Sequence, residues 1–450
     1  MPFPDKFVWG AAAASYQIEG AHAAAGKGES VWDMFARKPG AVYGGHHGDI
    51  ACDHVNRYAE DVQLWRSIGL QAYRFSISWP RVLPSGVGAV NEAGLSFYDR
   101  LVDALLEAGI TPYATCFHWD FPVALYRRGG WLNRDSADWF ADYVAVIAQR
   151  LSDRVEHWMT LNEPQCFVLF GHETGHQAPG DKLRQEEVLA AQHHVLLAHG
   201  KAVQALRAHA KRPLQIGYAP VGVVSVPATD DPRDLAAADR RMSSVAPGRW
   251  DNVSWSDPVF LGRYPEDASW LDALPRGFEQ DLPTIAQPLD FCGTNIYVGH
   301  SVRAGVDGEP EVVPEPPGSP HTALNWPVTP SALYHGPRFL HARYGKPIVI
   351  TENGLSSRDW VSVDGAVHDP SRIDFMTRYL RELHRATLAG VPVLGYFHWS
   401  IMDNFEWSEG YKDRFGLIHV DYQTQKRTLK DSAYWYKQVI ATNGEHLLAT

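Results

Sequence analysis

The sequence predicts an α/β fold, a single-domain (β/α)8 TIM barrel over residues 1–450 with elaborated βα loops. Two observations lead to it: eight short apolar runs alternate with long amphipathic segments, and no charge block or Gly/Ser linker divides the 450 residues. Strands buried on both faces form continuous apolar runs, and alternating strands and helices indicate a parallel sheet. A doubly wound open sheet is the alternative, but the chain has neither a GxGxxG nor a GxxxxGK[ST] loop.

The eight apolar runs are the predicted strands, and the charge-bearing stretches between them are the predicted helices. Strands are expected at Phe7–Ala14, Tyr73–Trp79, Thr111–Trp119, His157–Asn162, Leu214–Val221, Asp290–Val298, Pro347–Thr351 and Val393–Trp399. Helices are expected at Asp53–Ile68, Asn91–Ala108, Arg134–Leu151, Gln185–Ala210 and Pro370–Ala389. Gly305–Pro320 is rich in Pro and acidic residues and is predicted to be a surface loop.

Composition excludes several classes of function. The net charge is −11, without a basic stripe, so no nucleic-acid partner is expected. No apolar run reaches the roughly 18 residues of a membrane span, and the N-terminus does not read as a signal peptide. The cysteines stand far apart and are expected as buried thiols, at Cys52, Cys116, Cys166 and Cys292. We therefore expect a cytoplasmic protein that does not contact a membrane, with an oligomeric state that the sequence leaves open.

Polar side chains gather where the predicted strands end, which is the face that carries the active site in such barrels. Glu163 and Glu352 each follow an apolar strand, where an unpaired carboxylate is costly. Taken singly, each has a structural alternative as half of a salt bridge. Together, with the amides and aromatic rings at neighbouring strand ends, two carboxylates are the ingredients of glycoside hydrolysis, in which one protonates the leaving oxygen.

Seven motifs resemble glycoside hydrolase family 1, the β-glucosidase family, over essentially the whole chain. In chain order they are FVWGAAAASYQIEG, YRFSISWPR, FHWDFP, TLNEP, ITENG, FHWSIMDNFEW and RFGLIHVDY. The resemblance implies a retaining β-glucosidase that acts on a small β-glycoside or oligosaccharide, with β-galactosides or β-fucosides within reach. It implies no cofactor and no metal.

The resemblance also implies a role for each site residue. Glu163 corresponds to the acid/base and Glu352 to the nucleophile, with carboxyl groups about 5–5.5 Å apart. Because like charges resist joint ionisation, Glu163 is expected to hold a proton while Glu352 is ionised. Arg74 and Tyr297 are expected to support the nucleophile. The expected substrate-binding residues are Gln17, His118, Trp119, Asn162, Asn295, Tyr297, Trp326, Trp399, Glu406 and Trp407.

Within these implied roles, Asn162 binds the sugar 2-hydroxyl, Trp399 forms an aromatic floor and Trp326 is a platform for the leaving group. Gln165 departs from the family, which often carries Trp there, so the leaving-group side is expected to use Trp326 and polar contacts and to favour a second sugar. Ile296 also departs from a common Tyr, without consequence for Tyr297.

Three other functions compete with this prediction. A 6-phospho-β-glycosidase would replace the carboxylate region Asn404–Trp407, which is intact here. A non-catalytic sugar-binding protein on the same scaffold would lack one of the two glutamates. The segment His172–His176 matches the HExxH zinc pattern, but Gly175 and the following Gln-Ala-Pro-Gly predict a loop rather than the helix that the zinc site requires.

Overall fold

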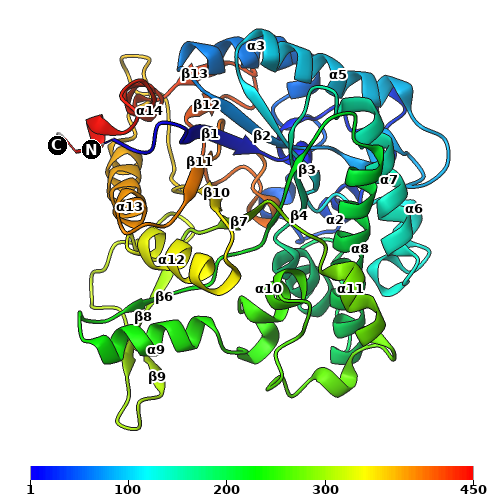
Figure 1. The fold of residues 1–450 in the computed structure, drawn as a ribbon. Coiled ribbons are helices and arrows are strands. Elements are labelled where there is room, and N and C mark those ends of the chain that lie inside the picture. Colours follow the sequence, from blue (N-terminus) through cyan, green and yellow to red (C-terminus); the bar gives the residue numbers. More distant parts are fainter. Residues whose placement is uncertain (1, 449–450) are drawn as a thin grey trace.

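A computed structural model describes residues 2–448 (Figure 1). Eight parallel strands close a barrel in the order β1, β2, β3, β4, β5, β7, β10, β11 and back to β1. Their bounds are β1 Val8–Ala13, β2 Ala72–Ser76, β3 Thr111–Phe117, β4 His157–Asn162, β5 Gln215–Ala219, β7 Phe291–Asn295, β10 Ile348–Asn353 and β11 Val393–Trp399. The barrel and all eight strand positions are confirmed.

Close packing inside the barrel explains the small residues of β1. Gly10 pairs with Ala72 of β2 on one side and with Phe397 of β11 on the other. A Cβ at Gly10 would lie 2.4 Å from the Phe397 ring, so a larger residue would force the strands apart. Four predicted strands end two or three residues early, at Ser76, Phe117, Ala219 and Asn295. The polar residues that follow them therefore belong to the loops at the carboxyl face.

Helices cover the outside of the barrel, apart from Pro232–Met242, which packs against a small separate sheet. Their bounds are α1 Ser15–Ile18, α2 Val31–Ala36, α3 His54–Ser67, α4 Trp79–Val82, α5 Glu92–Glu107, α6 Val123–Tyr126, α7 Ser136–Leu151, α8 Gln185–His209, α9 Pro232–Met242, α10 Val253–Phe260, α11 Leu282–Ile285, α12 Ala332–Tyr344, α13 Pro370–Leu388 and α14 Asp431–Ala441. The five predicted helices are all present, and their ends agree within two residues. Their apolar faces pack on the barrel, which is why periodicity located them.

A small sheet lies outside the barrel, beside α9 at the bottom of Figure 1. It consists of β6 Val224–Pro227, β8 Gly299–Ala304 and β9 Pro310–Val312; a separate hairpin pairs β12 Ile418–Val420 with β13 Arg427–Leu429. The prediction that Gly305–Pro320 is wholly a loop was wrong, because Pro310–Val312 pairs antiparallel with β8. The exposed edge of β8 supplies hydrogen-bond partners that local sequence does not reveal.

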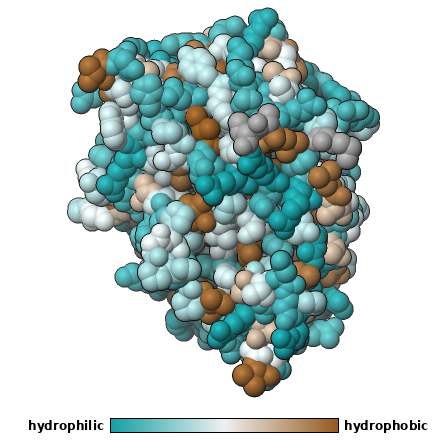
Figure 2. All heavy atoms as spheres, turned by 90° about the vertical axis from the view of Figure 1, so that its left-hand side faces the viewer, coloured by the Kyte–Doolittle hydropathy of each residue, from teal (hydrophilic) through white to brown (hydrophobic). Residues whose placement is uncertain are grey.

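The face of the molecule in Figure 2 is mainly hydrophilic, and hydrophobic residues are scattered singly among the polar ones. Within residues 2–448, no helix combines the length and apolar character that crossing a membrane requires. The four cysteines are buried and free.

Candidate active site

A cavity of about 370 Å³ opens at the carboxyl ends of the barrel strands. Most of the predicted site residues line it, namely His118, Trp119, Glu163, Asn295, Tyr297, Trp326, Glu352, Trp399, Glu406 and Trp407. Arg74, Asn162 and Gln17 do not line the cavity. They lie directly behind lining residues and hydrogen-bond to them.

Glu352, near the end of β10, is bound by a cation and a hydroxyl group. Arg74 of β2 donates from Nη1 to Glu352 Oε1 at 2.6 Å, and the Tyr297 hydroxyl donates to Oε2 at 2.8 Å. Burial raises the pKa of Glu352 above its ordinary value, and the Arg74 charge and these hydrogen bonds oppose that rise. Arg74 is itself buried, so little water screens the pair. A purely structural salt bridge between Arg74 and Glu352 would not explain why Glu352 lines a cavity beside a second carboxyl group, that of Glu163.

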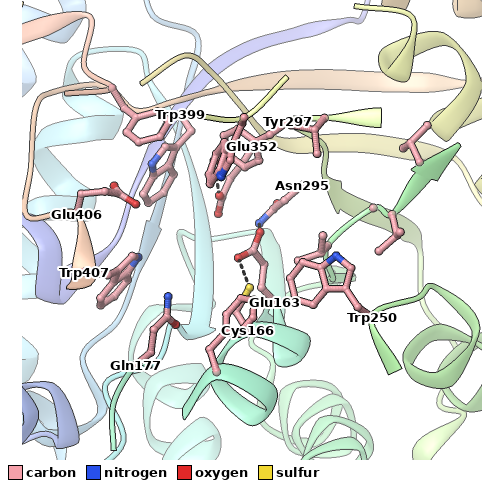
Figure 3. A pocket seen from close by; sticks show the side chains of 18 of the residues that line it. Glu163, Cys166, Gln177, Trp250, Asn295, Tyr297, Glu352, Trp399, Glu406 and Trp407 are labelled. Carbon is pink, nitrogen blue, oxygen red and sulfur yellow. Dashed lines mark hydrogen bonds between the residues drawn. The ribbon is translucent and has the colours of Figure 1, made fainter. Parts of the chain in front are cut away.

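Glu163 has no such cation. Its Oε1 accepts from Asn295 Nδ2 at 2.9 Å, and its Oε2 accepts from the Cys166 thiol at 3.2 Å. Burial and the negative charge of Glu352 raise the pKa of Glu163 to about 8. The two carboxyl groups face each other in Figure 3, with the Asn295 amide beside them. Their unequal surroundings therefore favour the proton on Glu163 and the charge on Glu352.

A network of amides fixes the orientation of this pair. Asn162 Oδ1 accepts from Arg74 Nη2 at 2.6 Å and from Asn295 Nδ2 at 3.0 Å, which leaves Asn162 Nδ2 to donate to His118 Nε2 at 3.0 Å. Burial and the Arg74 charge lower the pKa of His118 well below its ordinary value, so the ring is neutral and its proton lies on Nδ1. The indole N–H of Trp119 donates to the Asn162 carbonyl at 2.9 Å.

Aromatic and polar side chains form one side of the cavity, which we call the buried set: His118, Trp119, Trp399, Glu406 and Trp407. The Trp119 and Trp407 rings lie 4.5 Å apart, and His118 stacks on Trp399 at 5.7 Å. Behind Glu406, Gln17 donates from Nε2 to Asn404 Oδ1 at 3.0 Å and to the Phe405 carbonyl at 2.9 Å. Gln17 Oε1 accepts no hydrogen bond from the described residues.

Three residues that line this cavity have a strained backbone. Trp119, Glu163 and Trp407 all have positive φ, at 78°, 42° and 48°, although none is a glycine. Such conformations cost of order 1–3 kcal/mol each and persist only where the surroundings enforce them. Strain of this kind clusters at functional sites, and here it orients three lining side chains.

Several lining residues were not predicted. We call Phe170, Val221, Val223, Trp250, Val298 and Trp326 the apolar set, and of these only Trp326 was expected. Cys166 and Phe170 belong to the π-helix Cys166–Glu173, which follows Glu163 closely in the sequence. Their position a few residues after the NEP motif could therefore have indicated them. Trp250 and Val223 lie in loops far away in sequence, and no motif marked them.

The expectation that the Gln165 side chain lies on the leaving-group side of the cavity was wrong. Gln165 is fully buried and does not line the cavity; its Nε2 donates to the Val221 carbonyl, and its Oε1 accepts from the Val221 N–H, both at 3.2 Å. The Cys166 N–H donates to the Glu163 carbonyl at 2.9 Å, and this turn brings Cys166 to the face of Glu163 and directs Gln165 away. Gln165 therefore has no amide group left for a leaving group.

The prediction that the HExxH segment His172–His176 forms a loop was only partly correct. His172 and Glu173 end the π-helix, and only the residues after them are irregular. His172 Nδ1 lies 2.9 Å from Asp181 Oδ2, and Glu173 forms an ion pair with Arg249 at 3.0 Å. Among residues 2–448, no three His, Cys, Asp or Glu side chains are grouped so that they could hold a metal ion.

Comparison with known proteins agrees with this geometry. A family model described as glycosyl hydrolase family 1 matches residues 1–445. The 1,4-beta-D-glucan glucohydrolase of Thermotoga neapolitana is 44% identical over 98% of this chain and 99% of its own. Beta-glucosidase A of Thermotoga maritima is also 44% identical, over 98% of both chains. The crystal structure of a Thermotoga maritima beta-glucosidase in complex with glucoimidazole superposes with a TM-score of 0.90 at 43% identity, covering 98% of this chain and 99% of that one.

Proposed function

The chain belongs to glycosyl hydrolase family 1 and is a retaining β-glucosidase, and from this premise we propose that Glu352 is its nucleophile and Glu163 its acid/base. The observation that carries the assignment is the unequal surroundings of the two carboxyl groups. Arg74 and Tyr297 bind Glu352, whereas within residues 2–448 no lysine or arginine forms an ion pair with Glu163. An anion is required for attack on the anomeric carbon, and a proton is required for departure of the leaving group.

The proposed reaction has two steps. In the first, a Glu352 oxygen attacks the anomeric carbon as the bond to the leaving oxygen breaks, and the proton of Glu163 passes to that oxygen. In the second, Glu163 takes a proton from water, whose oxygen attacks the anomeric carbon and releases Glu352. The Arg74 guanidinium keeps Glu352 ionised before attack and remains beside it when it leaves.

The buried set is proposed to bind the glucosyl unit. Glu406, with Gln17 behind it, is placed to accept from the 4- and 6-hydroxyls, and Trp399 offers an indole face to the apolar C–H surface of the ring. The amide of Asn162 carries two hydrogens, and the one not directed at His118 is proposed to donate to the 2-hydroxyl. β-Galactosides and β-fucosides are proposed as weaker substrates. 6-Phosphoglycosides are proposed to be disfavoured, because burial and the neighbouring Glu352 charge already raise the pKa of Glu406 well above its ordinary value, and a phosphate dianion would add a further negative charge beside it.

The assignment of Glu163 is tested with Glu163→Ala. A dinitrophenolate leaves without protonation, so hydrolysis of dinitrophenyl β-glucoside should suffer little, while cellobiose hydrolysis falls by about 10²–10⁴-fold. Azide should restore turnover and yield a β-glucosyl azide. Glu107→Ala, which makes the same change on an exposed helix end, serves as the control. Equal losses on both substrates without an azide effect would overturn the assignment.

We also propose a cytoplasmic location. All four cysteines are free and buried, a state that a reducing compartment preserves. Cell fractionation with an activity assay on each fraction tests this; activity confined to an extracytoplasmic fraction would contradict it.

A further inference from the structure

Thr351 contacts the groups that support both carboxyl groups of the site. It precedes Glu352 in β10, and its side chain is fully buried. Its hydroxyl group donates to Asn295 Oδ1 at 2.6 Å, and its carbonyl accepts from Arg74 Nη1 at 3.1 Å. Asn295 in turn binds Glu163, and Arg74 binds Glu352. Thr351 therefore belongs to the layer behind the cavity, which it does not line.

An irregular strand register places Thr351 beside Asn295. β10 and β7 pair Ile350 with Thr294 and Glu352 with Asn295, so two steps along β10 correspond to one step along β7. Thr351 is the extra residue. Extra residues of this kind re-aim side chains, and they occur often beside active sites. The hydroxyl group consequently reaches the amide of the neighbouring strand.

The Asn295 amide has two possible orientations, which differ by a half-turn of its plane. In the observed orientation, Nδ2 donates to Glu163 Oε1 at 2.9 Å and to Asn162 Oδ1 at 3.0 Å. In the rotated orientation, Asn295 Oδ1 would face both of these oxygens. A protonated Glu163 would then donate to Asn295, which would hold the proton away from the leaving oxygen.

The Thr351 hydroxyl group distinguishes the two orientations. In the described part of the chain, Asn295 Oδ1 is its only hydrogen-bond partner. If the amide were rotated, the hydroxyl group would face Nδ2 and accept, and its own hydrogen would lose its acceptor. A buried donor without a partner is costly, so the hydroxyl group favours the observed orientation.

From this geometry, and resting on the proposed function, we infer that Thr351 is a positioning residue for the acid/base: its hydroxyl group fixes the Asn295 amide with an N–H directed at Glu163. Thr351 does not touch the substrate. It acts through one amide, whose orientation decides whether Glu163 accepts a hydrogen bond there or donates one.

The effect on Glu163 has a defined direction. Burial and the Glu352 charge raise the pKa of Glu163, whereas the hydrogen bond from Asn295 lowers it. The titratable groups that face Glu163 are Arg74, Cys166, Tyr297, Glu352 and Glu406. Within residues 2–448, none of these groups bonds to the Thr351 hydroxyl. Loss of this hydroxyl therefore removes the Asn295 contribution and raises the pKa of Glu163.

The test uses Thr351→Val, which removes the hydroxyl group and keeps the shape of the side chain. The basic limb of the kcat/KM profile for cellobiose should move up by about one pH unit, because Glu163 must be protonated to act as an acid. At the optimum pH, kcat/KM for cellobiose should fall about tenfold, while dinitrophenyl β-glucoside, which needs no proton, stays within about twofold. Thr351→Ser keeps a hydroxyl group and should retain both the limb and the rate.

Two controls show whether Thr351 acts through Asn295. Thr160→Val makes the same change at a buried position of β4, where the hydroxyl group lies 2.6 Å from His199 Nδ1, and should leave the limb in place. In an Asn295→Ala background, Thr351→Val should cause no further shift. Circular dichroism checks the fold, and Thr351→Ala, which also lacks the hydroxyl group, provides the same test if the valine variant does not fold.

The outcomes separate this inference from the proposed function. It is overturned by an unmoved basic limb in the folded variant that lacks the hydroxyl group, by an equal shift in Thr351→Ser or Thr160→Val, or by an undiminished shift in the Asn295→Ala background. Each of these results leaves the assignment of Glu163 intact. That assignment fails separately, if Glu163→Ala loses activity equally on cellobiose and dinitrophenyl β-glucoside without an azide effect.

Discussion

The buried set and the apolar set line the same cavity, yet they are built differently. The buried set comes from the ends of β3 and β11 and the loops directly after them, and its members contact one another and a dense hydrogen-bond network. The apolar set comes mostly from longer loops and is half-exposed. This difference indicates that the barrel strands position the groups proposed to carry out the reaction and to bind the reacting sugar. The longer loops determine which leaving groups can bind.

The largest effect is expected at the carboxyl pair itself. Glu352→Gly removes the group that forms the covalent intermediate, so hydrolysis should fall by roughly 10⁶-fold, as when other covalent nucleophiles are lost. The protein should stay folded by circular dichroism. With α-glucosyl fluoride and a benzyl or aryl acceptor it should form β-glycosidic bonds, since the product can no longer be cleaved. Substantial residual hydrolysis of dinitrophenyl β-glucoside would contradict the role of Glu352.

The second prediction tests whether Glu352 must be ionised to act. Arg74→Met removes the 2.6 Å contact to Glu352 and should lower kcat by about 10²–10³-fold. Without the cation the pKa of Glu352 rises, and because this group must be ionised, the acidic limb of the pH–rate profile should move to higher pH. Arg212→Met, which breaks an exposed ion pair with Glu156, is the matched control. An unchanged acidic limb would mean that Arg74 acts only structurally.

A third prediction concerns the support beneath the apolar set. Gln165→Leu keeps similar volume but leaves the Val221 N–H and carbonyl without partners, and should lower the free energy of unfolding by about 1–3 kcal/mol. Hydrolysis of methyl β-glucoside should remain within about twofold, because the buried set is untouched. Thermal denaturation and steady-state kinetics measure the two quantities. A loss of activity without a loss of stability would show that Gln165 contacts the substrate.

The smallest effect is expected from a change at Cys166, which contacts Glu163. The Cys166 thiol stays neutral because burial raises its pKa, and it donates to Glu163. This bond favours the ionised form, so Cys166→Ala should raise the pKa of Glu163. Because Glu163 must be protonated to act as an acid, the basic limb of the kcat/KM profile should move up by about 0.5 unit. Cys166→Ser, which keeps a donor, should restore the limb; a limb that moves equally in both variants would refute the interpretation.

The sequence alone determined the barrel and the chemistry of the buried set. Continuous apolar runs located all eight strands, because strands buried on both faces leave no polar positions. The strand ends then placed Glu163, Glu352 and Trp399 on one face, since parallel strands in a closed barrel share a direction. The structure brings these residues to one cavity, as predicted, although their individual roles remain predictions.

Only the tertiary structure decided the apolar set and the direction of individual side chains. Trp250 lies against Phe170, and an ion pair joins Arg249 to Glu173 of the π-helix, 76 residues earlier in the sequence. No local pattern encodes such a contact. Gln165 points away from the cavity because the turn after Glu163 presents Cys166 instead. Strand periodicity is a local property that a sequence displays directly. Loop conformation depends on contacts with residues distant along the chain, so it can be described only from the folded structure.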